Sequence, residues 1–321
     1  MNNLKVSRRE ALTRAGAFIG AAVVAHNFPS AAASPSGTQA NNEQPFRFSL
    51  NTATIRGQKL GIVKEVEIAS QAGYDAIEPW VESVEEYQKN GGALSDLRKR
   101  IADAGLTVEG AIGFPEWIVD DDGRRAKGME RARREMDVMA QIGARRFAAP
   151  PAGATDLPKL DLFRAAERYR ALLEAGDQIG LVPELELWGF SKNLNHLGEC
   201  VAVAMETGHP KACVLADIFH LYKGGSRIQG IGLLGPRAVQ VLHMNDFPSD
   251  PPREKIDDSY RVFPGDGSGP IAEILTLLRR TGGQKVLSLE LFNRTYWGQD
   301  PLTVAKAGLA KMKMAAQAVV L

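Results

Sequence analysis

Short apolar segments of strand length alternate with longer amphipathic segments of helical period from Phe46 to the end of the chain. This alternation is typical of repeated βα units, whose strands form a parallel sheet. The pattern predicts eight strands, at Phe46–Leu50, Tyr74–Glu78, Thr107–Ile112, Arg146–Ala149, Leu181–Leu187, Ala212–Ala216, Val239–Met244 and Val286–Leu291.

The amphipathic segments predict helices at Leu60–Ala72, Ala93–Ala104, Arg125–Ile142, Leu160–Ile179, Ile271–Arg280 and Leu302–Ala316. Four of them end at a glycine just before the next strand, namely Gly73, Gly105, Gly143 and Gly180. Glycine readily adopts the left-handed conformation that ends a helix, which supports these boundaries. The connection 220–236 is rich in glycine and has a weak helical pattern, so we expect a short or irregular helix there.

Eight strands in about 275 residues match the size and strand number of a closed parallel barrel. The alternative is an open, doubly wound sheet, which usually has a G-x-G-x-x-G loop after its first strand. The segment 49–57 contains no such loop. We therefore predict a single-domain (β/α)₈ TIM barrel over residues 46–321.

The first 33 residues contain a basic start, a short apolar stretch and an exit of small residues, which is the order found in an export signal. Arg8 and Arg9 give this segment a resemblance to a twin-arginine (Tat) signal. The apolar stretch 15–25 is shorter than a membrane span, so we expect cleavage near Ala33, a periplasmic protein and no stable membrane insertion. An uncleaved anchor and export by the Sec route are the alternatives. The polar residues 34–45 are predicted to form a disordered linker.

The charge is nearly balanced, with 39 basic and 38 acidic residues. A chain without an overall positive field is not expected to bind nucleic acid, so a small-molecule substrate fits better. Cys200 and Cys213 are too few for a disulfide framework, and two buried free thiols are expected rather than a disulfide. Formation of a homo-oligomer is left open.

Ligand-type side chains close four consecutive predicted strands. They are Glu186, Asp217, His243 and Glu290. Catalytic groups of a parallel barrel project from the carboxyl ends of its strands, so these side chains are expected to converge. Three carboxylates and one imidazole suit Mn²⁺, Mg²⁺, Co²⁺ or a similar ion, and we predict one divalent metal site. For each residue alone, a surface salt bridge is the competing explanation.

Together with His220, these residues resemble the metal-site pattern of the xylose isomerase-like TIM barrel superfamily, also called sugar phosphate isomerases/epimerases. The resemblance covers the chain from Phe46 to the last helix. It implies that Glu186 and Glu290 bind the metal and also exchange protons with substrate, while Asp217 and His243 mainly hold the metal. It also implies substrate contacts from His220 and from Arg261, which precedes a segment that resembles the family's Pro-Gly-x-Gly turn.

Other strand-end residues are ambiguous. Glu184 points to the same face as Glu186 but lies deeper, so Glu186 is the preferred ligand. Glu78 could hydrogen-bond to the substrate or only to the end of a neighbouring strand. Three aromatic residues, Phe114, Trp117 and Trp188, could form a wall against a sugar ring or could simply be packed in the core.

The expected activity is metal-dependent isomerisation or epimerisation of an unphosphorylated keto sugar or related polyol, by α-proton transfer through an enediolate. Glu186 and Glu290 are the expected proton-transfer residues. The main alternative is a 3-keto-glycoside lyase that uses the same first step. A sugar-binding barrel without activity and a DNA-repair nuclease are the remaining alternatives; the nuclease typically uses more metals and more histidines.

Overall fold

The computed structural model describes residues 44–319. The predicted export signal and most of the predicted linker lie outside these described residues. The strands are β1 (Phe46–Asn51), β2 (Ala76–Glu78), β3 (Thr107–Val108), β4 (Arg146–Ala149), β5 (Val182–Glu186), β6 (Val214–Asp217), β7 (Val241–Met244) and β8 (Lys285–Leu289).

The α-helices are α1 (Ile62–Ala72), α2 (Val81–Lys89), α3 (Leu94–Asp103), α4 (Asp122–Gln141), α5 (Leu162–Ile179), α6 (Leu197–Glu206), α7 (Ile218–Gly224), α8 (Ile271–Arg280), α9 (Arg294–Trp297) and α10 (Pro301–Gln317). Short 3₁₀ helices are η2 (Thr52–Gln58), η3 (Ile228–Leu233) and η4 (Asp258–Tyr260). The connection after β6 contains only α7 and η3, which confirms the expected short helix there.

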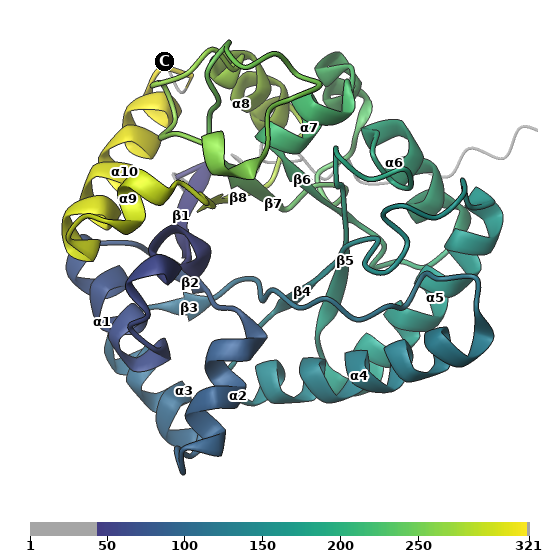
Figure 1. Cartoon of the computed structure of the whole chain (residues 1–321), viewed down its shortest axis with the longest axis horizontal. Helices are drawn as coiled ribbons and strands as arrows, with labels where there is room; N and C mark the ends of the chain where they lie inside the picture. The colour runs from purple at the N-terminus through teal and green to yellow at the C-terminus, as the bar shows by residue number, and fades with distance from the viewer. Residues whose placement is uncertain (1–43, 320–321) are drawn as a thin grey trace, which may run out of the picture. The chain divides into compact units, whose positions relative to one another are not determined.

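The eight strands are parallel and run in the order β3-β2-β1-β8-β7-β6-β5-β4. The two ends of this order meet, because Val108 and Ala144 form a parallel bridge and the Ala148 amide donates to the Ala111 carbonyl at 2.9 Å. Helices surround the strands (Figure 1). The domain is therefore the predicted single (β/α)₈ barrel.

Six of the eight strands are shorter in the structure than predicted, and β3 differs most. β2 begins at Ala76 rather than Tyr74, and β3 ends at Val108 rather than Ile112. The ladder beyond β3 is interrupted at Gly110, where a Cβ atom would lie 2.1 Å from the Glu78 carboxylate, and resumes as a single bridge between Ile112 and Trp80. The Glu78 side chain thus lies directly against the backbone at Gly110 and leaves no room for a larger residue there.

The inner face of the barrel has an apolar layer beneath its carboxyl end. Leu215, Val241 and Val286 belong to one buried cluster. Successive side chains of a strand alternate between its faces, so residues two positions further on point the same way. Asp217, His243 and Ser288 therefore lie above this layer, at the end where the strands finish.

Both cysteines are buried and free, as expected. Within residues 44–319, none of the helices is long and apolar enough to cross a membrane.

One buried carboxyl group makes the stability of the barrel depend on pH. Glu65 in α1 is 3% exposed, and its Oε2 atom has no hydrogen-bond partner. Burial raises its pKa from 4.5 to about 7, against the opposing charge of Arg56. Between these values the folded chain keeps a proton that the unfolded chain has lost, so the stability falls as the pH rises from 4.5 to 7.

Glu65→Gln should remove this dependence, because glutamine stays neutral. The shift corresponds to about 3 kcal/mol, so at pH 8 the Tm of the variant should exceed that of the wild type by roughly 5 to 10 °C, with little difference at pH 4.5. Thermal unfolding across this pH range measures the effect. Glu67→Gln, an exposed change on the same helix, is the control; equal pH dependence in all three proteins would contradict the assignment.

Candidate metal and active site

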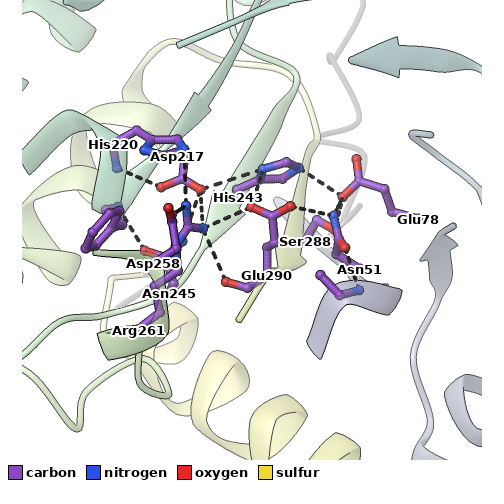
Figure 2. Close-up of polar contacts among 12 residues, drawn as sticks. Asn51, Glu78, Asp217, His220, His243, Asn245, Asp258, Arg261, Ser288 and Glu290 are labelled. Atoms are coloured by element: carbon purple, nitrogen blue, oxygen red, sulfur yellow. Dashed lines mark hydrogen bonds and ion pairs between the residues drawn. The ribbon is translucent and has the colours of Figure 1, made fainter. Parts of the chain in front are cut away.

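Three of the four predicted metal ligands meet at the carboxyl end of the barrel. Asp217 ends β6 and pairs in register with His243 on β7, and Glu290 follows β8 directly. One ligand atom from each of the three lies within 4.8 Å of the others. Figure 2 shows them side by side. The His243 Nδ1 atom lies 3.1 Å from Glu290 Oε2 and 3.7 Å from Asp217 Oδ2.

The two oxygens of the Asp217 carboxylate make different contacts. Its Oδ1 atom accepts from the His220 amide at 2.9 Å and caps α7. Its Oδ2 atom faces His243 and Glu290, and these three residues are called the cluster below. Burial would raise the pKa of Asp217, but the Arg261 guanidinium and the neighbouring histidines outweigh it and hold the pKa well below its usual range. Burial would likewise lower the pKa of His243, but Glu290 and Glu78 raise it well above 6.5.

Arg261 lies completely buried against the same carboxylates. Its Nη1 atom donates to Asp217 Oδ2 at 2.7 Å and to Glu290 Oε2 at 2.9 Å. Its Nη2 atom donates to Asp258 Oδ1 at 2.6 Å and lies 3.2 Å from His220 Nε2. The guanidinium therefore joins three carboxylates to the predicted substrate-binding histidine, an arrangement visible in Figure 2. Asp258 is not among the residues predicted from the sequence, although it lies three residues before Arg261.

The segment that carries Arg261 is held in place by Asp246. This buried carboxylate accepts from the amides of Gly265, Gly267 and Gly269 at 3.0, 3.1 and 2.8 Å. Asp246 also forms an antiparallel bridge with Val262, next to Arg261. A side chain at 267 would collide with the Asp246 carboxylate, which explains a glycine there.

Asp246→Asn should loosen this loop, because an amide nitrogen would face backbone N–H groups that need an acceptor. We expect a loss of about 1 to 3 kcal/mol in the free energy of unfolding and faster proteolysis between residues 247 and 268. Denaturant unfolding and limited proteolysis measure both effects. Asp266→Asn in the same loop, where the aspartate is partly exposed and pairs with Lys311, should have little effect. Equal losses in both variants would contradict the role of Asp246.

Glu186 ends β5 and lines the same cavity, but it is not part of the close group of three. Its Oε2 atom is buried without a hydrogen-bond partner. Burial raises the pKa of Glu186 to about 8, with the nearby His243 opposing the shift. Glu184 lies deeper, beside Arg146 at 3.3 Å, as expected from its position on the strand.

The cavity above these groups has a volume of about 180 Å³. Besides Glu186, Glu290, His220, Arg261 and Asp258, aromatic side chains line it. They are Trp80, Phe114, Trp188, Phe190 and Phe292. The predicted residues Phe114 and Trp188 are thus at the cavity, with ring centroids 5.9 Å apart. Sequence reasoning missed Trp80, whose ring lies 5.1 Å from Phe114.

Two other predicted substrate contacts do not reach this cavity. Trp117 is fully buried in the core, where its indole donates to the Pro150 carbonyl at 2.8 Å and its ring packs on Tyr169. This corrects the prediction of a wall residue, because the helix-side core covers the whole ring. Glu78 is also buried, and its carboxylate faces His243 rather than the cavity.

The donor set fits a divalent cation. Glu186 Oε2 and His243 Nδ1 are both buried polar atoms without a hydrogen-bond partner. Buried polar atoms are normally paired, and a cation would supply the missing partner for both. Three carboxylates and one imidazole do not by themselves select one metal.

Comparison with known proteins places these features in a family. The profile of the xylose isomerase-like TIM barrel family matches residues 66–315. An inosose isomerase from Halalkalibacterium halodurans is 24% identical over 250 residues, which cover 74% of this chain and 84% of that protein. A 3-dehydroshikimate dehydratase from Pseudomonas aeruginosa is 26% identical over 253 residues, which cover 76% of this chain but 38% of that protein.

Solved structures show the same fold. The structure of IOLI protein with a bound zinc atom has a TM-score of 0.78 at 19% identity and covers 84% of this chain and 98% of its own. A structure of L-ribulose 3-epimerase has a TM-score of 0.69 at 19% identity and covers 85% and 95%. Because the family profile matches residues 66–315, most of this chain, the chain belongs to the xylose isomerase-like TIM barrel family.

Proposed function

We propose that this chain is a metal-dependent isomerase or epimerase that acts on an unphosphorylated keto sugar or related polyol. The proton it moves is the one on the carbon next to the carbonyl group. The observation that carries the proposal is the pair Glu186 and Glu290, two carboxyl groups that line one small cavity beside His243 and Arg261. The sequence relatives include an inosose isomerase and a 3-dehydroshikimate dehydratase.

Glu186, Asp217, His243 and Glu290 would hold the metal. When bound, a divalent cation would polarise the substrate carbonyl and lower the cost of an enediolate. In the proposal, one of Glu186 and Glu290 removes the α-proton and the other returns a proton, each at a carboxylate oxygen. Arg261 and His220 orient the substrate oxygens, and Asp258 keeps the guanidinium turned toward the cavity.

The lining of the cavity favours an uncharged ring. Arg261 is the one lysine or arginine among the described residues that line it, and it already contacts three carboxylates. A phosphate group would therefore meet a negative site without a free cationic partner. Aromatic faces such as Trp80 and Trp188 instead suit the C–H surface of a ring.

Elimination is the second candidate, because the dehydratase relatives and a 3-keto-glycoside lyase would share the first proton abstraction. Protein loaded with Mn²⁺, Mg²⁺, Co²⁺ or Zn²⁺ should be incubated in D₂O with ketoses, inososes, 3-dehydroshikimate and 3-keto-glycosides. We expect NMR to show deuterium at one α-carbon, together with the formation of an epimer or isomer. An enone or a released aglycone without epimer would instead support elimination, and no exchange with any ketone would contradict both.

A further inference from the structure

Glu78 lies beside His243, one of the four predicted metal ligands. It ends β2, is 1% exposed and does not line the cavity. A single oxygen, Oε2, accepts from Ser288 Oγ at 2.6 Å and Asn51 Nδ2 at 2.9 Å and lies 3.0 Å from His243 Nε2. Figure 2 shows Glu78 on the side of His243 that faces away from Asp217.

The two ring nitrogens of His243 consequently face different groups. Nε2 faces Glu78, whereas Nδ1 faces Glu290 and Asp217 and has no hydrogen-bond partner. A neutral imidazole carries one N–H, and a metal binds the nitrogen that lacks it. Once a bound metal takes the place of the second ring proton, a proton held on Nε2 by Glu78 leaves the lone pair of Nδ1 directed at Asp217 and Glu290.

The carboxylate has little freedom to move. A methyl group at Gly110 would lie 2.1 Å from Glu78 Oε1, so the chain passes directly against the outer oxygen. On the other side, Asn51 also donates to Glu290 Oε1 at 3.1 Å and so connects Glu78 with a second member of the cluster. These contacts fix both the position and the direction of the acceptor.

We propose that Glu78 is a positioning residue that fixes the tautomer and the ring orientation of His243 for metal binding at Nδ1. The proposal rests on the metal site of the proposed function. It replaces the expectation that Glu78 contacts the substrate. Carboxylates that orient a ligating histidine in this way commonly contribute about 10- to 100-fold to metal affinity.

The test compares Glu78→Gln with Ser288→Ala. Glu78→Gln keeps the shape of the side chain, but its amide can turn either an oxygen or an NH₂ group toward His243 Nε2. Ser288→Ala removes one donor to the same oxygen and leaves the Glu78–His243 contact in place. The Kd for Co²⁺ is measured by competition with a chelator, and the visible absorption of bound Co²⁺ reports the coordination geometry. We expect Glu78→Gln to weaken binding by about 10- to 100-fold and to change the spectrum. Ser288→Ala should change the Kd by about threefold or less.

Gly110→Ala gives an independent test that keeps every polar group, because its methyl group would push against Glu78 Oε1. It should also weaken Co²⁺ binding, and it substitutes for Glu78→Gln should that variant not fold. Unchanged Co²⁺ binding in the folded variants, or equal weakening by Ser288→Ala, would overturn the role of Glu78. A different result would contradict only the proposed function. In that case the wild type binds Co²⁺ and Glu78→Gln binds it more weakly, as expected, but the wild type exchanges no α-proton.

Discussion

Replacement of Glu290 by glutamine is expected to lower kcat roughly 10²- to 10⁴-fold, while the affinity for the keto substrate changes by only about threefold. Glutamine keeps the size of the side chain and one carbonyl oxygen that can still accept from Arg261 Nη1, but it cannot take up a proton. A loss confined to turnover would therefore come from proton transfer rather than from a collapsed cavity.

The measurement combines steady-state kinetics with substrate binding, under saturating metal. Glu82→Gln is a matched control, because Glu82 is an exposed carboxylate that contacts Arg56 at 3.3 Å outside the cluster. Its kcat should equal that of the wild type. A Glu290→Gln variant with full turnover would remove Glu290 from the mechanism, and the same variant with intact turnover but weak metal binding would reduce it to a ligand.

The strand-end residues could be recognised from the sequence because the barrel imposes a simple rule. Asp217 and His243 follow apolar strand residues, and parallel strands of similar length bring their carboxyl ends to one edge. The same rule predicted Glu290 as a ligand and favoured Glu186 over Glu184. Period-two alternation within each strand is a local property, so it needs no knowledge of the rest of the fold.

Other parts of the site depend on contacts that local patterns do not encode. Trp117 and Trp80 both follow predicted strands, but only the packing of the helices decides that the first is enclosed and the second faces the cavity. The orientation of Glu78 toward His243 joins residues 165 positions apart. Asp246 acts through backbone amides of a loop, which have no signature beyond the glycines themselves.

Replacement of Arg261 by methionine is expected to have the largest effect on stability. Methionine fills much of the volume but leaves Asp217, Glu290 and Asp258 without their shared cation. Removing one partner of a buried ion pair typically costs about 3 to 5 kcal/mol, which corresponds to a fall in Tm of roughly 10 °C or more. Arg124→Met, which breaks the exposed pair with Glu116, should change the Tm by no more than about 2 °C.

The same variant separates the electrostatic role of Arg261 from its packing. A divalent cation bound by Asp217 and Glu290 would offset the charge that the variant lacks, so added Mn²⁺ should raise the Tm of Arg261→Met more than that of the wild type. Thermal unfolding with chelator and with excess metal gives both values. Equal metal-induced shifts in the two proteins would mean that Arg261 stabilises the barrel through packing against Phe219 and Phe292 rather than through its charge.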